Sequence, residues 1–112
     1  MNINSTITPV LLAAADASKS LIAAPGVGMA IAVQAIHWSI VTAAAQLVKI
    51  GVSAGTEAQQ LLEFAASASG NGSRFFSGRG FILPSNTALT AVPAAAGPAI
   101  HFIIESNNIP TL

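Results

Sequence analysis

The 112-residue chain contains no cysteine and no tyrosine, and it has very few charged residues. Without cysteine there are no disulfide bridges and no thiolate metal sites, and the redox compartment stays undetermined. Charged residues make up 7% of the chain, with four basic and four acidic side chains and no net charge. A nucleic-acid-binding surface needs a positive stripe. We therefore expect no nucleic-acid partner.

Hydrophobic residues are abundant, at 53% of the chain. Soluble proteins usually carry about 25% charged residues, so a lone monomer of this composition would have too little charge to keep its surface soluble. We expect much of the surface to be covered by copies of the chain or by a larger assembly. The first six residues lack the positive charge of a secretory signal. Synthesis and assembly in a cytoplasm are therefore expected.

The longest uncharged run covers residues 20–48 and includes the only tryptophan. Its side chains favour β-strands, because many are β-branched or aromatic. The apolar residues also alternate, first at Met29, Ile31 and Val33, and then, one position out of phase, at Ile36, Trp38 and Ile40. This pattern predicts a long strand that contains a β-bulge or a bend near residues 34–35.

A membrane-spanning helix over residues 20–48 is the alternative, since about 20 apolar residues suffice to cross a bilayer. Such a helix would carry Gln34, His37 and Ser39 in lipid, which is costly without partners. The Pro25-Gly26 pair inside this run is also typical of a turn rather than of a helix. The abundance of alanine keeps the helical alternative open.

Further strands are predicted from shorter alternating patterns. Residues 47–52 have one apolar and one mixed face, and residues 80–92 form two extended pieces around a Pro-Ser-Asn turn. In the last strand, Ile100, Phe102 and Ile104 are expected to face the core, with His101 and Glu105 on the other face. Residues 56–66 allow a short helix with a Thr56–Gln59 capping box, or a strand with Leu62 and Phe64 inward and Leu61 and Glu63 outward.

Seven or eight short strands separated by turn signals predict an all-β fold, a single-domain antiparallel β-sandwich. We expect a domain at residues 10–106, an N-terminal arm at residues 1–9 and a C-terminal tail at residues 107–112.

The order of these patterns resembles that of small jelly-roll virion proteins of tailed bacteriophages. The resemblance covers roughly residues 16–106 and is carried by the Gly80-Phe81-Ile82-Leu83-Pro84-Ser85-Asn86-Thr87-Ala88-Leu89 segment and by the closing Ile100-His101-Phe102-Ile103-Ile104-Glu105 strand. It implies a jelly-roll sandwich and, as in the capsid decoration (cement) proteins of the family, a homotrimer on the capsid surface. The chain is richer in alanine than many members and lacks tyrosine, which puts a sugar-binding aromatic platform in doubt.

Three functions follow as hypotheses. The first is a decoration protein that self-associates around a three-fold axis and stabilises the shell by bridging subunits of the major capsid protein. The second is a receptor-binding or glycan-binding tip of a fibre or spike, which would bind through residues 67–80. The third is a small holin-like membrane protein with residues 20–48 as its span. We favour the first, which predicts no membrane partner.

The candidate contact residues for a capsid or a neighbouring subunit lie in the arm, in the glycine-rich middle and in the tail. They are Asn2, Ile3, Asn4, Arg74, Phe75, Phe76, Arg79, Asn107, Asn108 and Ile109.

No catalytic or metal-binding constellation can be assembled from the sequence. His37 and His101 are the only histidines. One of them could pair with an acidic residue to activate Ser39, or both could join Glu105 at a metal, but no spacing supports either arrangement. We therefore expect no enzymatic activity, no cofactor and no metal.

Overall fold

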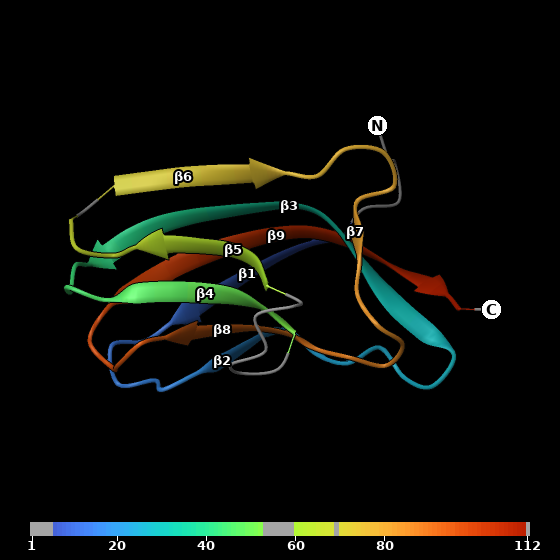
Figure 1. Ribbon diagram of the computed structural model, residues 1–112, viewed down its shortest axis with the longest axis horizontal. Helices are drawn as coiled ribbons and strands as arrows, with labels where there is room; N and C mark the ends of the chain where they lie inside the picture. The colour runs from blue at the N-terminus through green and yellow to red at the C-terminus, as the bar shows by residue number, and fades with distance from the viewer. Residues whose placement is uncertain (1–5, 53–59, 69, 112) are drawn as a thin grey trace.

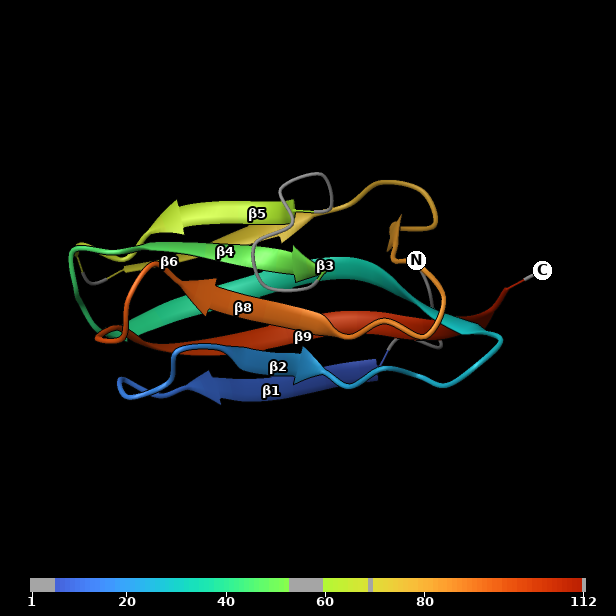
Figure 2. The ribbon, with the colours of Figure 1, turned by 60° about the horizontal axis from the view of Figure 1, so that its bottom comes forward.

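The computed structural model describes residues 6–52, 60–68 and 70–111. These residues form β-strands and no helix, and the strands make two antiparallel sheets that pack as a sandwich (Figures 1 and 2). Sheet A has the order β1 (Thr6–Leu12), β9 (Ala99–Pro110), β3 (Met29–Thr42) and β6 (Gly70–Phe75), and β7 (Phe81–Ile82) also pairs with β3. Sheet B has the order β2 (Lys19–Ile22), β8 (Leu89–Pro93), β4 (Leu47–Val52) and β5 (Gln60–Ala65). The prediction of an all-β sandwich is confirmed.

The strands pair in a nested way along the chain. β1 pairs with β9, β2 with β8, β3 with β6 and β7, and β4 with β5, and all of these pairs are antiparallel. Two further antiparallel pairs, β3 with β9 and β4 with β8, join the nested pairs into sheets. The chain therefore folds back on itself as one long ribbon whose successive pairs alternate between sheet A and sheet B.

The long strand β3 contains the predicted irregularity. Its register against β9 shifts between Val33 and Ala35, as a β-bulge requires. Because of this extra residue, the two out-of-phase apolar sets both reach the core: Ile31, Val33 and Ile36 are fully buried. A bulge thus converts two apparent faces in the sequence into one face in the sheet.

The core lies between the two sheets, and β9 contributes one side of it. Ile100, Phe102 and Ile104 are fully buried, as the alternation predicts. Sheet B supplies Val48 and Ile50 from β4, which are also fully buried. Full burial of side chains of this size stabilises the fold by about 1.5–3 kcal/mol each.

An aromatic cluster links the sheets near their β5 and β6 edges. The ring of Trp38 in β3 stacks on the ring of Phe64 in β5, with centroids 4.6 Å apart, and Phe64 meets Phe102 edge to face at 6.3 Å. Gly72 in β6 lies opposite Trp38 in the register. The indole occupies the space that a side chain at position 72 would need.

The segment with the competing helix and strand predictions is a strand where the structure describes it. Residues 60–65 form β5, and residues 56–59, which hold the proposed capping box, lie outside the described residues. Phe64 and Leu62 pack against the core as expected, but Leu61 is also buried, which the alternation did not predict. The register of β5 against β4 shifts between Ile50 and Gly51, so simple alternation ends at this point.

The strands at both ends of the chain extend beyond the expected domain limits. β1 begins at Thr6, inside the range expected for the arm, and β9 continues to Pro110, inside the range expected for the tail. Residues 20–48, the span of the membrane alternative, contain most of β2 and all of β3. Among the described residues, no helix is long and apolar enough to cross a bilayer.

We expect the Gly72→Ala substitution to lower the free energy of unfolding by about 1–3 kcal/mol, the usual cost of overpacking. A Cβ atom at this position would overlap Cζ2 of Trp38 and lie 2.7 Å from its Cε2. Urea unfolding followed by the fluorescence of Trp38, the only tryptophan, measures the change. The control is Asn71→Ala on the same strand, whose side chain is exposed and whose effect should stay within about 0.5 kcal/mol. Equal unfolding midpoints for the two variants would contradict the assigned packing.

Candidate interaction surface

One side of the sandwich exposes an unusual number of large apolar side chains. They lie on the outer surface of sheet A, where alternate residues of β1, β9, β3 and β6 point away from the core. We call this surface the sheet A face. The exposed fractions are 65% for Ile7, 44% for Leu11, 56% for Val41, 70% for Phe75 and 44% for Ile103.

The core determines that these side chains point outward. Leu12 and Phe102 are fully buried between the sheets, and successive residues of a strand point to opposite faces. Leu11 and Ile103 must therefore face outward. The exposure of this surface is a consequence of the register that buries the core.

The outer surface of sheet B differs. It carries Lys49 and Glu63, whose charged atoms lie 3.9 Å apart, and the moderately exposed Thr90 and Val92. Leu47 is the one large apolar side chain on this surface that is exposed among the described residues. The two faces are thus unequal, and the sheet A face is the more apolar.

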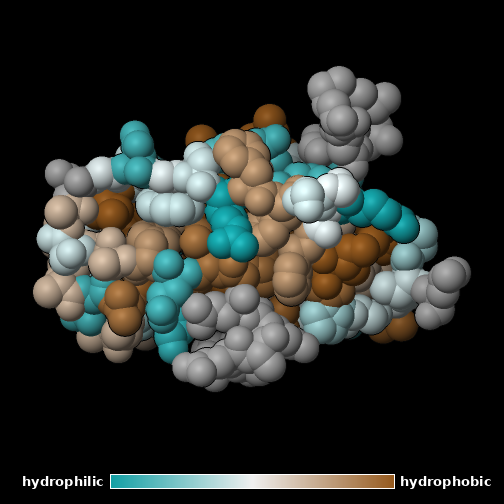
Figure 3. Space-filling view, turned by 45° about the horizontal axis from the view of Figure 1, so that its top comes forward, coloured by the Kyte–Doolittle hydropathy of each residue, from teal (hydrophilic) through white to brown (hydrophobic). Residues whose placement is uncertain are grey.

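A third region of apolar surface lies on the side of the molecule that carries β6. Figure 3 turns this side toward the reader and shows hydrophobic residues gathered along its middle, with hydrophilic residues around them. β6 is the last strand of sheet A and β5 is the last strand of sheet B. Phe64 of β5 and Trp38, which lies opposite Gly72 of β6, are only partly buried although they pack against the core.

A hydrogen-bonded chain of three side chains crosses the sheet A face. His37 lies on β3, with its Nδ1 atom 2.7 Å from Oγ of Ser73 on β6 and its Nε2 atom 2.7 Å from Oε2 of Glu105 on β9. A carboxylate only accepts hydrogen bonds, so Nε2 carries the hydrogen and donates it. In the neutral imidazole, Nδ1 is then the acceptor, and the Ser73 hydroxyl donates to it. The ring of Phe75 meets the imidazole edge to face at 5.4 Å.

The order hydroxyl, imidazole, carboxylate is the order used in nucleophilic catalysis. The sequence suggested Ser39 as the nucleophile beside a histidine, whereas in the fold Ser73 is the serine that is hydrogen-bonded to His37. The three side chains lie on an open sheet surface, beside a recess of about 360 Å³ that is also lined by Ser39 and His101. Catalysis of this kind relies on an environment that excludes water. The chain of hydrogen bonds is better suited to holding three strands in one orientation.

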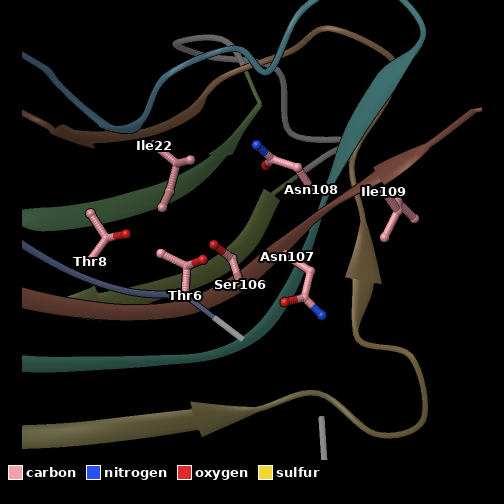
Figure 4. A pocket seen from close by; sticks show the side chains of 7 residues that line it. All are labelled: Thr6, Thr8, Ile22, Ser106, Asn107, Asn108 and Ile109. Carbon is pink, nitrogen blue, oxygen red and sulfur yellow. The ribbon is translucent and has the colours of Figure 1, made fainter. Parts of the chain in front are cut away.

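A polar cleft lies at the other end of β9, next to the start of β1 (Figure 4). Its volume is about 570 Å³, within the usual range for ligand pockets. The Oδ1 atom of Asn107 is buried and has no hydrogen-bond partner. The lining residues carry no charge and are mostly hydroxyl or amide side chains: Thr6, Thr8, Ile22, Ser106, Asn107, Asn108 and Ile109. The cleft could accept a neutral polar segment that supplies a hydrogen-bond donor.

The structure brings some of the predicted contact residues together and separates others. Asn107, Asn108 and Ile109 all line the polar cleft. The other described candidates lie in β6 or between β6 and β7. Asn2, Ile3 and Asn4 lie outside the described residues.

Phe75 and Phe76 are adjacent in sequence but face different surroundings. Phe75 belongs to the sheet A face, whereas Phe76 packs against the core and meets Phe81 edge to face at 6.0 Å. The guanidinium of Arg74 lies 5.3 Å from the centre of the Phe76 ring. The backbone oxygen of Arg79 accepts a hydrogen bond from the side chain of Gln34 at 2.9 Å. These residues therefore do not form a single contact patch.

Most residues of the sheet A face are not among the contact residues that the sequence predicts. Ile7, Leu11, Val41 and Ile103 were not singled out as contact residues. A signal was present in the run Phe102-Ile103-Ile104, because an apolar run without alternation is typical of a strand covered on both faces.

No protein-family model matches the chain, and no curated protein shows significant similarity to it. Among the described residues, no group of three histidine or acidic side chains is arranged to hold a metal ion. The sheet A face is the most distinctive of the surfaces of this chain, because it exposes the most large apolar side chains among the described residues.

We expect His37 to carry its hydrogen on Nε2 when the ring is neutral, because Glu105 accepts from that atom. Nitrogen-15 chemical shifts of the ring at alkaline pH measure the tautomer. Glu105→Ala should give a mixture of the two tautomers and change the free energy of unfolding by no more than about 1 kcal/mol, since both side chains are partly exposed. Glu63→Ala on sheet B should leave the shifts unchanged. An unchanged tautomer in Glu105→Ala would refute the assigned hydrogen bond.

Proposed function

We propose that the chain is a structural subunit that associates with copies of itself through the sheet A face. The observation that carries this proposal is the exposure of Ile7, Leu11, Val41, Phe75 and Ile103 on one surface. Apolar patches larger than a few hundred Å² are rare on monomers and usually mark interaction sites. The low charge of the chain, at 7% of residues, supports the same conclusion.

We also propose that the fold is a jelly roll. What supports this is the nested pairing of the strands, since a jelly roll consists of eight strands in two sheets formed by a wrapped antiparallel ribbon. If the short β7 is set aside, the strand orders are β1-β9-β3-β6 and β2-β8-β4-β5. Each successive pair of the ribbon then contributes to alternate sheets, as this fold requires.

Together with the sequence resemblance, these features favour a virion protein of a tailed bacteriophage. The proposed role is that of a decoration protein, assembled in the host cytoplasm, that stabilises the capsid by bridging neighbouring subunits of the major capsid protein. A trimer is the order of association that the resemblance implies. The polar cleft beside Asn107 is the proposed capsid contact on this chain, because its lining consists mostly of uncharged hydroxyl and amide side chains that can hydrogen-bond to a neighbouring polar segment.

The Ile103→Glu substitution should abolish self-association, because it places a carboxylate in the middle of the apolar face. Sedimentation velocity of the purified protein measures the mass of the assembly. Leu47→Glu is the matched control: Leu47 is 49% exposed and Ile103 is 44% exposed, but Leu47 lies on the outer surface of sheet B. It should leave the assembly intact. Equal assembly masses for Ile103→Glu and the unchanged protein would exclude the sheet A face as the interface.

The capsid role is tested by imaging the particle that carries this chain. Electron microscopy should show the protein distributed over the shell in hundreds of copies, as bridging of capsid subunits requires. A few dozen copies or fewer at a fibre tip would instead favour the receptor-binding hypothesis. In that case the decoration role would be wrong even if self-association through the sheet A face is confirmed.

A further inference from the structure

The outward-facing residues of β1 and β9 are arranged symmetrically about one residue pair of the sheet A face. In the register of sheet A, Pro9 of β1 lies opposite Ile103 of β9. Two residues away in one direction, Leu11 lies opposite His101, and two residues away in the other direction, Ile7 lies opposite Glu105. On β1, the central Pro9 is therefore flanked by two large apolar side chains. On β9, the central Ile103 is flanked by an imidazole and a carboxylate.

Such a pattern is complementary to itself under a two-fold rotation. Consider an axis that lies in the interface, passes over Ile103 and runs at right angles to the strands. The rotation reverses the strand direction but leaves β1 over β1 and β9 over β9. It places Leu11 against Ile7 of the second copy, and His101 against Glu105 of the second copy. Ile103 meets Ile103 on the axis itself, so each contact is made twice, as in any isologous interface.

We propose that two copies of this chain pack sheet A face to sheet A face about this two-fold axis. The inference rests on the proposed self-association and specifies its geometry. Sheets that pack face to face keep their strands within about 30° of each other, so the residues on facing strands stay close. Apolar side chains on β1 then cover one another, and the imidazole N–H of His101 donates to the carboxylate of Glu105 across the interface.

The charged and titratable groups favour this axis over a two-fold axis that passes over β9 and runs parallel to it. That parallel axis would place Glu105 against Glu105 and His101 against His101. Like charges facing each other at an interface are unfavourable. Among the described residues, the sheet A face also carries the titratable His37, and both of its ring nitrogens are already hydrogen-bonded within one copy, to Ser73 and Glu105. On the axis it therefore meets its equivalent through ring carbon atoms.

A two-fold contact closes on two copies, so the proposal predicts assemblies with an even number of subunits. If another surface forms the trimer expected from the resemblance, the sheet A contact joins two trimers into a six-subunit particle. Native mass spectrometry of the purified, unchanged chain counts the subunits. Two or six copies are expected, and a stable particle of three copies would overturn the two-fold contact.

The pairing of Leu11 with Ile7 is tested by mixing two variants. Leu11→Glu alone places a carboxylate against Ile7, and Ile7→Lys alone places an ammonium group against Leu11. Each single variant should weaken association by at least about tenfold, because an unpaired charge is buried. In an equal mixture, the hetero-assembly has a Glu–Lys pair at one contact and the original Leu–Ile pair at the other. It should therefore form in preference to either homo-assembly.

The control mixture combines Leu11→Glu with Leu47→Lys. Leu47 lies on the outer surface of sheet B, so its new charge cannot reach position 11 of a second copy across the sheet A face. This mixture should therefore not restore the association of the Leu11→Glu variant. Restored association would show that the charges act nonspecifically.

Failure of the two-fold geometry and failure of the proposed function give different results. If the unchanged chain is a monomer by native mass spectrometry, both are wrong. If the single variants weaken association but the mixture of Leu11→Glu and Ile7→Lys does not restore it, the sheet A face is an interface without the proposed two-fold axis. Both single variants are expected to fold, because Ile7 and Leu11 are exposed at the surface. Urea unfolding of each variant checks this.

Discussion

The pairing of β9 with β1 on one side and β3 on the other is the constraint on which the rest of the structure depends. Side chains alternate along a strand, so the burial of Ile100, Phe102 and Ile104 determines which residues of all three strands point outward. A shift of the register by one residue would bring His101 and Glu105 into the core. The cost of burying those polar groups excludes it. The residues that are buried in the core therefore also determine which residues form the sheet A face.

β6 connects the packing of the interior with the polar network of the surface. Its Gly72 leaves room for Trp38, which stacks on Phe64 and so ties sheet A to sheet B. The next residue, Ser73, points to the opposite side and is hydrogen-bonded to His37. One short strand therefore serves the core and the sheet A face through adjacent residues, because successive side chains point to opposite sides.

The low charge of the chain is easier to understand for an assembly than for a monomer. On its outer side β9 has an apolar residue, Ile103, between the polar His101 and Glu105, and on its inner side it has Ile100, Phe102 and Ile104. Strands covered on both faces have sequences of this kind. The cross-strand chain from Ser73 through His37 to Glu105 adds rigidity to the same surface, and a rigid surface loses less conformational entropy when it associates.

Much of the local structure could be predicted from the sequence, because the period of two is visible within a few residues. The strand character of residues 29–42, the irregularity near residues 34–35 and the inward direction of Phe102 were all predictable in this way. The buried position of Leu61 was not, because the register shift beside Gly51 depends on how β5 pairs with β4.

The sequence by itself determined that this chain forms strands with one apolar side and that its surface carries little charge. Only the tertiary structure decided which strands are neighbours, and with them which residues share a surface. Ser73 rather than Ser39 reaches His37, and Ile7 and Leu11 lie beside β9 although about 90 residues separate these strands along the chain. The physical reason is that alternation is a local property of the backbone. Strand order instead depends on which non-local pairings bury the most apolar surface together, and no short stretch of sequence contains that information.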